Sequence, residues 1–162
     1  MIRPYVYNNF FMEVIMKNIG VGIGVIIYND KNELLLIKRS SNPIDADSDM
    51  RLEGTYTLPS GKMLPLESFE QAGKRKVKEE VGLDVLENDL KLVSISNDIN
   101  EYAHYVTIGM VAEKYSGEIK LKEGVEFTSY GWFSEMPKEL CEPSKKILNN
   151  YLNNKIYSKE ER

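Results

Sequence analysis

Apolar and polar positions divide the chain into short strand-like segments around one long helical segment. Residues 21–28 alternate with a period of two, which is typical of a β-strand. The turn formers Asn29-Asp30-Lys31-Asn32 follow, and residues 33–38 are again mostly apolar. This pattern predicts a β-hairpin, followed by a polar loop over residues 39–55. β-branched and aromatic residues predict further strands at residues 56–58, 90–95, 104–112 and 130–133.

The clearest helix begins after Ser68. Ser68 and Gln71 have the spacing of a capping box, and Gly82 supplies a C-terminal stop. The apolar stripe of this helix consists of Phe69, Ala72, Val77 and Val81. A last helix begins at Pro143-Ser144. Its expected core-facing residues are Ile147, Leu148, Tyr151 and Leu152.

Strands on both sides of one central helix, closed by a C-terminal helix, indicate a mixed α/β sandwich. The absence of repeats and linkers predicts a single domain over residues 19–154. Residues 155–162 form a charged C-terminal tail, and residues 1–18 form an aromatic N-terminal extension. This extension is expected either to pack on the domain or on a second subunit, or to be a disordered leader. The most apolar stretch, residues 19–28, is far shorter than the ~20 residues that cross a bilayer, so we expect no membrane partner.

Composition, charge and cysteine count exclude some classes of function. The chain has 162 residues, 42% of them hydrophobic, and a formal net charge of −4. A mildly acidic chain lacks the basic surface that extended nucleic-acid binding needs. The single cysteine, Cys141, excludes an internal disulfide and a cysteine-rich zinc site. This usage fits a reducing compartment, so we expect a cytoplasmic protein.

Residues 59–83 carry the candidate chemistry. A glycine turn leads through a loop with Glu67 into the capped helix, which ends in the adjacent pair Glu79 and Glu80. Oxygen-rich carboxylate clusters suit hard cations such as Mg²⁺ or Mn²⁺, which also bind substrate phosphates. An ordinary solvated helix end with Lys/Glu pairs would give the same charges. Chemistry alone leaves both interpretations open.

The spacing of these residues resembles the signature of the Nudix hydrolases. Eight of its nine specified positions match, namely Gly61, Glu67, Arg75, Val77, Glu79, Glu80, Gly82 and Leu83. The flanks agree as well, with Lys38-Arg39 and Leu58-Pro59 before the motif and Trp132-Phe133 after it. The resemblance implies a Nudix-type α/β/α sandwich with a mixed β-sheet, one catalytic helix after a glycine loop and a C-terminal helix.

The resemblance also implies an activity and a cofactor. Nudix enzymes hydrolyse a nucleoside diphosphate linked to another group, with Mg²⁺ or Mn²⁺. Matched position by position, Glu79 and Glu80 are expected to be metal ligands, with the Ser60 carbonyl as a further one. Arg75 is expected to orient the glutamates, and Glu67 to brace the loop. Metal ions of this kind neutralise the diphosphate and activate a bound water.

The ninth position differs, because Lys76 stands where the motif has its first helical glutamate. Lys76 can reach Glu79 or Glu80, and the exchange shifts the local charge by two, which predicts fewer or weaker metal sites. Three interpretations follow: an active enzyme with a base from another loop, a weak hydrolase, or a nucleotide-binding module without turnover. Of these we favour activity.

Several residues outside the motif are secondary candidates. Glu118 lies where a loop glutamate of the family approaches the metal, with Glu123 and Glu126 as alternatives. The strand that begins at His104 places Tyr105 and Thr107 on the face opposite to His104 and Val106. Candidate substrate-binding residues are Arg39, Lys38, Tyr56 and His104. Each of these also has a structural interpretation, as a rim charge, a core aromatic or a hydrogen-bonded histidine.

The favoured function is hydrolysis of nucleoside triphosphates to release pyrophosphate. Its ground is the His104-Tyr105-Val106 strand, since similar strands occur in Nudix enzymes that act on nucleoside triphosphates and in those that act on GDP-mannose. The alternative is a nucleotide-sugar hydrolase, acting on a GDP-mannose-like or ADP-ribose-like substrate. A weakened nucleotide-binding or interaction module is the alternative from another class. The expected partner is a small nucleotide, and a homodimer is expected by likeness to the family.

Overall fold

The computed structural model describes residues 18–159. Its central sheet has the strand order β4-β1-β6-β5. The bounds of these strands are β4 Ser60–Lys62, β1 Gly20–Ile26, β6 His104–Ala112 and β5 Leu90–Ile99. β1 runs parallel to β6 and antiparallel to β4, so the sheet is mixed, as expected.

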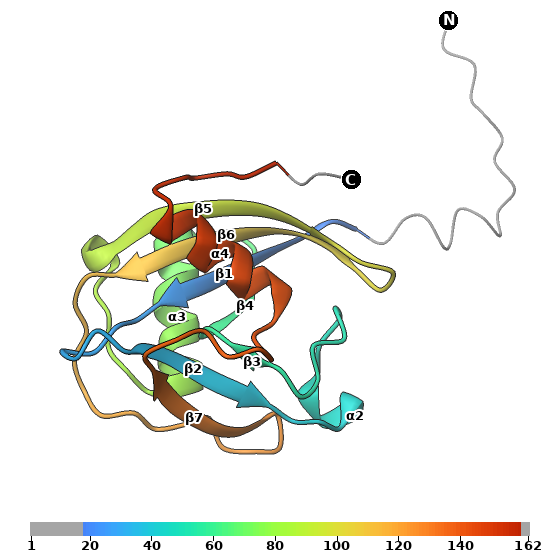
Figure 1. Cartoon of the computed structure of the whole chain (residues 1–162), viewed down its shortest axis with the longest axis horizontal. Helices are drawn as coiled ribbons and strands as arrows, with labels where there is room; N and C mark the ends of the chain where they lie inside the picture. Colours follow the sequence, from blue (N-terminus) through green and yellow to red (C-terminus); the bar gives the residue numbers. More distant parts are fainter. Residues whose placement is uncertain (1–17, 160–162) are drawn as a thin grey trace, which may run out of the picture.

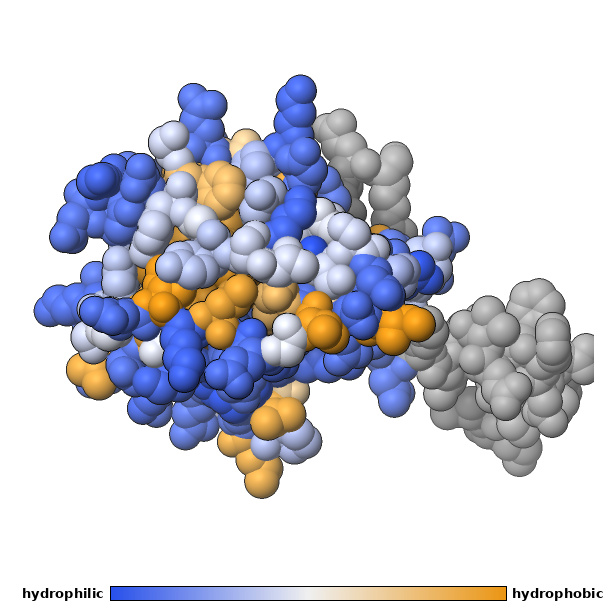
Figure 2. Space-filling model, turned by 90° about the horizontal axis from the view of Figure 1, so that it is seen from below, coloured by the Kyte–Doolittle hydropathy of each residue, from blue (hydrophilic) through white to orange (hydrophobic). Residues whose placement is uncertain are grey.

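A smaller second sheet has the order β3-β2-β7 and lies beside the first (Figure 1). Its strands are β3 Tyr56–Thr57, β2 Leu34–Arg39 and β7 Phe127–Phe133. The helices are α2 Pro43–Ala46, α3 Phe69–Val81 and α4 Glu142–Leu152, and a 3₁₀ turn, η1, covers Glu87–Asp89. Figure 2 shows that the side bordered by this second sheet is largely hydrophilic, with an apolar band across its middle.

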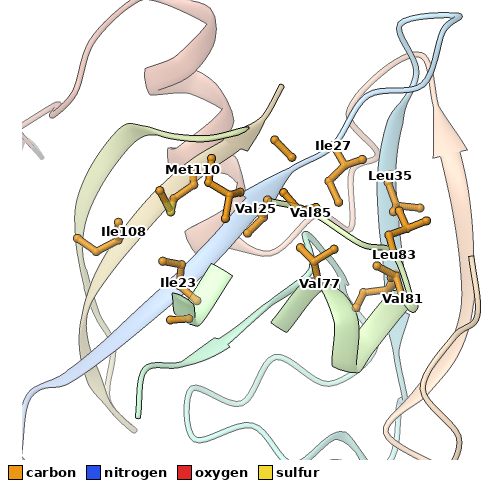
Figure 3. Packing of buried hydrophobic residues seen from close by; sticks show 14 of the residues in the cluster. Ile23, Val25, Ile27, Leu35, Val77, Val81, Leu83, Val85, Ile108 and Met110 are labelled. Atoms are coloured by element: carbon orange, nitrogen blue, oxygen red, sulfur yellow. The ribbon is translucent and has the colours of Figure 1, made fainter. Parts of the chain in front are cut away.

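The two longer helices cover opposite faces of the central sheet. Val25 packs in one core cluster with Val77 and Val81 of α3 (Figure 3). Its neighbour Ile26 packs in the other cluster with Ile147 and Leu148 of α4. Successive strand residues point to opposite faces, so β1 separates the two helices. The chain therefore has the predicted α/β/α sandwich.

The prediction of a hairpin over residues 21–38 is wrong beyond the turn. A bridge joins Tyr28 to Leu34, and the Leu35 amide donates to the Ile27 carbonyl at 2.9 Å. After these contacts the two strands separate into different sheets. β1 pairs along its length with β6, whereas β2 pairs with β3 and β7. Each strand thus pairs with segments that lie far from it in the sequence.

The helix prediction is confirmed at both ends. The Ser68 hydroxyl accepts from the Gln71 amide at 3.1 Å, and the Gln71 side chain accepts from the Ser68 amide at 2.9 Å. Gly82 ends α3 with a φ of 74°, a conformation that favours glycine. Of the predicted stripe, Phe69 is the exception, because 37% of its surface remains exposed.

Other boundaries differ from the predictions. β5 continues to Ile99, and β7 begins at Phe127. Residues 39–55, expected as a loop, contain the short helix α2, which Asn42 caps by accepting from the Ile44 amide at 2.9 Å. In α4 the expected contribution of Leu152 to the core is wrong, because 58% of its surface is exposed.

The ends of the chain were expected to lie outside the domain. The N-terminal extension lies outside the described residues, apart from Asn18. In the C-terminal tail, the Ile156 carbonyl accepts from the Ile95 amide of β5 at 2.7 Å. Among the described residues, no helix has the length and apolar character needed to cross a membrane.

Candidate functional site

The site begins where β4 leads into the loop before α3. The hydrogen-bonded pairing of β4 with β1 places Gly61 opposite Ile23. A Cβ atom at Gly61 would lie 2.4 Å from Cε of Lys76, so the absence of a side chain lets the lysine stem pass across this strand. Gly61 therefore makes room for Lys76, the residue at which this chain departs from the motif.

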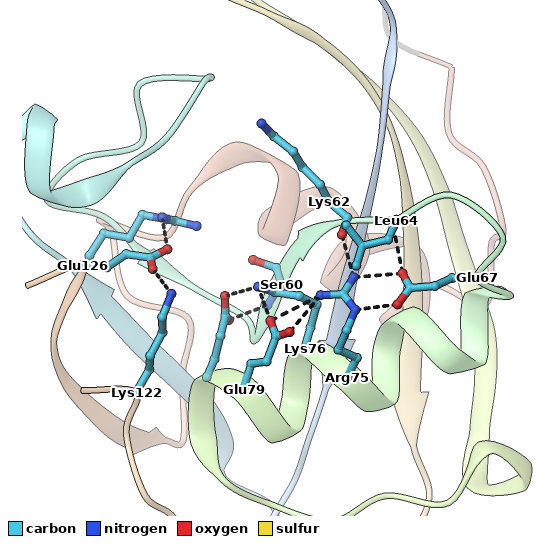
Figure 4. A network of polar contacts seen from close by, with 11 residues as sticks. Ser60, Lys62, Leu64, Glu67, Arg75, Lys76, Glu79, Lys122 and Glu126 are labelled. Atoms are coloured by element: carbon cyan, nitrogen blue, oxygen red, sulfur yellow. Dashed lines mark hydrogen bonds and ion pairs between the residues drawn. The ribbon is translucent and has the colours of Figure 1, made fainter. Parts of the chain in front are cut away.

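Glu67 and Arg75 hold the loop against α3. The Arg75 guanidinium forms an ion pair with Glu67 and donates to the Lys62 carbonyl at 2.9 Å. The Leu64 amide donates to the same carboxylate at 2.8 Å. The Arg75 hydrogen bond holds the pKa of Glu67 at about 2, below its ordinary value of 4.5. The predicted bracing contact of Glu67 is present in this geometry (Figure 4).

Lys76 bridges the two adjacent glutamates. Its Nζ atom lies 3.1 Å from Glu79 Oε2 and 3.2 Å from Glu80 Oε1. Arg75 Nη1 lies 3.2 Å from Glu79 Oε1, and the Ser60 amide donates to Glu80 Oε2 at 2.8 Å. The expectation that Lys76 reaches this pair is confirmed, and the orienting contact of Arg75 with Glu79 is also present (Figure 4).

The two glutamates have different environments. Glu80 is 1% exposed, and this burial raises its pKa to about 7 against the opposing attraction of Lys76, the Ser60 amide and Arg39. The side chain of Glu79 is 44% exposed. Its partial burial is outweighed by Lys76 and Arg75, so the pKa of Glu79 is lowered. Burial thus favours the neutral form of Glu80, whereas the two cations favour the ionised form of Glu79.

A cleft of about 340 Å³ opens beside these residues. Its basic lining residues are Arg39, Lys62, Arg75 and Lys76. Its acidic lining residues are Asp47 and Asp49. Tyr105 and Thr107 of β6 line it as well, and the Tyr105 hydroxyl donates to Asp49 at 2.7 Å. Among these lining side chains cations outnumber carboxylates, so we call this space the basic cleft. Each of the four cations also contacts a carboxylate, which an anionic ligand would displace.

Lys38 and Tyr56 do not line this cleft. The Lys38 ammonium lies 4.2 Å from the centre of the Tyr56 ring, and that ring packs edge-on against Phe133 at 5.0 Å. Both contacts lie in the second sheet. The structure therefore gives these two predicted substrate-binding residues packing contacts instead.

Arg39 does line the cleft, but its charged end is already engaged. Its Nη1 atom donates to the Ala46 carbonyl at 2.8 Å and lies 3.3 Å from Glu126 Oε1. Only 8% of Arg39 is exposed. It therefore anchors α2 and the loop before β7 to the floor of the cleft.

His104 makes a structural hydrogen bond. Its Nε2 atom lies 2.6 Å from Asn97 Oδ1 on the neighbouring strand β5. It is not among the residues that line the basic cleft, whereas Tyr105 and Thr107 are. The predicted alternation along this strand is therefore confirmed, with the cleft on the face opposite to His104.

The loop after β6 brings Glu126, rather than Glu118, toward the carboxylate pair. The Lys122 amide donates to the Glu80 carbonyl at 2.8 Å, and Lys122 Nζ lies 2.6 Å from Glu126 Oε2. Glu118 follows the bridge between Ser116 and Asp84, beyond the C-terminal end of α3. Spacing in the sequence could not distinguish these glutamates, because the loop's path is set by its contacts with the helix.

Lys62 lines the cleft although no pattern in the sequence predicted it. Lys62 Nζ lies 2.6 Å from Asp49 Oδ2 across the cleft, and this contact raises the pKa of Lys62. Both residues belong to segments without regular periodicity. The acidic character of residues 45–49 was the only signal in the sequence for this loop.

The family model for the NUDIX domain matches residues 18–150. The chain belongs to the Nudix family. Similarity to individual proteins agrees with this assignment. An ADP-ribose pyrophosphatase from Methanocaldococcus jannaschii is 30% identical over 133 residues, covering 82% of this chain and 73% of that protein. As a Nudix hydrolase, the chain acts on phosphoanhydride bonds.

Two further similar proteins match this chain over different shares of their own length. An 8-oxo-dGDP phosphatase NUDT18 from Danio rerio is 29% identical over 104 residues, which cover 64% of this chain but only 28% of that relative. The crystal structure of a MutT NUDIX hydrolase from Burkholderia pseudomallei superposes with a TM-score of 0.70 at 28% identity. That match covers 83% of this chain and 98% of the other. The fold is therefore shared over nearly the whole domain.

Nudix hydrolases generally use divalent metal ions, and the arrangement of this site does not fit such an ion. Hard oxygen donors are present in Glu79 and Glu80, but the Lys76 ammonium lies at the point where they converge. Within residues 18–159 no group of three or more acidic, histidine or cysteine side chains is arranged to hold a metal. Metal ligation by Ser60, Glu79, Glu80 or Glu118 stays a prediction, and at the glutamate pair it would require Lys76 to move.

Proposed function

We propose that this chain hydrolyses a nucleoside diphosphate joined to a sugar, with ADP-ribose as the substrate to test first. The observation that carries the proposal is the basic cleft next to the Nudix helix, with a second pocket adjacent to it. A diphosphate with a bulky group at each end matches this arrangement.

The second pocket has a volume of about 510 Å³. It shares the lining residues Met50, Leu52 and Pro143 with the basic cleft, so the two spaces are adjacent. Its lining is mostly apolar, with a few polar side chains that include Asn100 and Lys146, which suits a base or a sugar. One end of the substrate would occupy this pocket while the phosphates lie in the basic cleft.

The proposed roles follow from position. Lys62, Arg75 and Lys76 bind phosphate oxygens, because their side chains line the cleft and carry the charge that the phosphates need. Glu79 and the buried Glu80 form the carboxylate pair that turnover requires, and Glu79, whose side chain is 44% exposed, takes the proton from the attacking water. Glu67 is a positioning residue, because it acts through Arg75 and the Leu64 amide.

Similarity supports the choice of a sugar-linked diphosphate. The archaeal relative at 30% identity is an ADP-ribose pyrophosphatase, and the match extends over most of both chains. The Danio rerio relative is named as acting on a nucleoside diphosphate. Both likenesses favour a diphosphate over a longer phosphate chain.

A nucleoside triphosphate is the second candidate. The strand that suggested it does contribute to the site, because Tyr105 and Thr107 line the cleft. His104, however, is hydrogen-bonded to Asn97 and does not line the cleft. The strand that suggested triphosphates thus contributes Tyr105 and Thr107 to the cleft but not His104, and the adjacent second pocket favours a sugar-linked diphosphate.

A substrate panel tests the proposal. Purified protein is offered ADP-ribose, GDP-mannose, nucleoside triphosphates and dinucleoside polyphosphates, each with Mg²⁺, with Mn²⁺ and with EDTA. We expect the highest kcat/KM for ADP-ribose, with AMP and ribose 5-phosphate as products. Release of pyrophosphate from a triphosphate at a higher kcat/KM would support the second candidate. Nucleotide binding without turnover of any compound would support a non-catalytic module and refute the proposal.

We also infer a reducing, cytoplasmic location. Cys141 is 3% exposed and unpaired, and its thiol donates to the Ser144 hydroxyl at 3.2 Å. A buried thiol in this role is compatible with a reducing compartment. Fractionation of cells that express the tagged protein tests the location.

A further inference from the structure

Lys76 occupies a defined position rather than a solvated one. Only 14% of its side chain is exposed, although it lies on a surface helix. Its stem packs over Gly61, and its ammonium contacts both Glu79 and Glu80. A lysine is usually found with its charge in water, so these contacts account for its burial.

The ammonium also lies between the carboxylates and the cleft. Lys76 and Arg75 line the cleft, whereas Glu79 and Glu80 are not among its lining residues. A ligand that enters the cleft therefore meets a cation first. The ammonium therefore contacts the two glutamates and also belongs to the lining of the cleft.

The net charge of the five charged side chains around Lys76 differs from that of a site with the complete Nudix motif. With every side chain ionised, Glu67, Glu79 and Glu80 carry three formal negative charges, and Arg75 and Lys76 carry two positive ones. A glutamate at position 76, as in the motif, would make the local net charge −3 instead of −1. A cluster with a charge of −1 attracts a divalent cation much less strongly than one of −3.

We propose that the Lys76 ammonium takes the place of a metal ion in this site. It neutralises the Glu79–Glu80 pair and binds a phosphate oxygen of the substrate directly, so nucleotide binding needs no divalent cation. The identity of the ligand rests on the proposed function. The cation replacement itself rests on the contacts of Lys76.

Calorimetry in EDTA tests the proposal with α,β-methylene-ADP, whose phosphate bridge cannot be hydrolysed. Three variants accompany the wild type: Lys76→Met, Lys76→Glu and, as a matched control, Lys74→Met. Lys74 lies on the same helix with 51% of its side chain exposed and is not among the cleft residues. Thermal melting confirms that each variant is folded. Mn²⁺ binding without nucleotide is measured in parallel by electron paramagnetic resonance.

We expect the wild type to bind the analogue in EDTA, Lys76→Met to bind it at least tenfold more weakly, and Lys74→Met to remain within twofold. Lys76→Glu should bind Mn²⁺ at least tenfold more tightly than the wild type. Equal analogue affinity for wild type and Lys76→Met, or equal Mn²⁺ affinity for wild type and Lys76→Glu, overturns the proposal. If the wild type hydrolyses ADP-ribose but binds no analogue in EDTA, this inference fails while the proposed function stands. If it neither binds nor hydrolyses any nucleotide, the proposed function fails as well.

Discussion

Replacing Glu67 by glutamine should destabilise the fold at neutral pH and have little effect in acid. The ion pair with Arg75 lowers the pKa of Glu67 from 4.5 to about 2. Each pKa unit corresponds to ~1.4 kcal/mol, so the ion pair stabilises the fold by at most ~3.4 kcal/mol. The Glu67 side chain is 16% exposed. Solvent screening therefore reduces the stabilisation by the ion pair to about 1–2 kcal/mol.

The sign of the pH dependence follows from the direction of the shift. The carboxylate of Glu67 is ionised in both states above pH 4.5, so its full stabilisation is present there. Between pH 4.5 and 2 the unfolded chain takes up the proton first, and the stabilisation is lost. Glutamine preserves the size of the side chain and an acceptor for the Leu64 amide.

Urea unfolding from pH 2 to pH 8 measures this effect on the wild type and the Glu67→Gln variant. We expect a difference in the free energy of unfolding of about 1–2 kcal/mol at pH 7 that falls toward zero near pH 2. Glu113→Gln, at an exposed position after β6, is the matched control and should show no such difference. A difference that is the same at pH 2.5 and pH 7 would refute the reasoning.

Three further substitutions test separate parts of the structure. Gly61→Ala places a Cβ atom 2.4 Å from Cε of Lys76 and should displace that side chain. We expect kcat/KM to fall at least tenfold in steady-state assays, and an unchanged value would show that the position of the lysine is unimportant. Lys62→Met removes a cation from the cleft and should raise KM about fivefold while kcat changes less than twofold, and an equal loss in kcat would contradict a binding role. Asn150→Ala leaves the buried hydroxyl of Ser94 without its 2.8 Å donor and should lower the free energy of unfolding by about 1–3 kcal/mol in urea; a change below ~0.5 kcal/mol would contradict this.

The parts of the fold that depend on local sequence were predictable. The limits of α3 follow from Ser68, Gln71 and Gly82, whose effects act within a turn or two. Strand partners were not predictable in this way. The alternation in residues 21–28 identifies a strand, but β6, its parallel partner, lies about eighty residues away in the chain. Local periodicity therefore gave a hairpin where the structure has two sheets.

The same distinction applies to the site. The relation of Lys76 to Glu79 and Glu80 was predictable, because residues three and four apart on a helix are neighbours. The choice between Glu118 and Glu126 was not, since it depends on where a long loop meets the helix. The role of Lys38 also depends on tertiary contacts, because the adjacent strand supplies the Tyr56 ring that its ammonium covers.

The central claim is that the adjacent glutamates of this cleft are required for cleavage of a phosphoanhydride bond. Its most direct test is kcat/KM for ADP-ribose, measured for the wild type, Glu79→Gln, Glu80→Gln and the exposed control Glu113→Gln. We predict a loss of at least a hundredfold in both helix variants, or ~2.7 kcal/mol of transition-state stabilisation, and less than threefold in the control. Their melting temperatures at pH 8 should not be lower than that of the wild type by more than a few degrees. If either helix variant is folded and retains more than a third of the wild-type kcat/KM, the claim is contradicted.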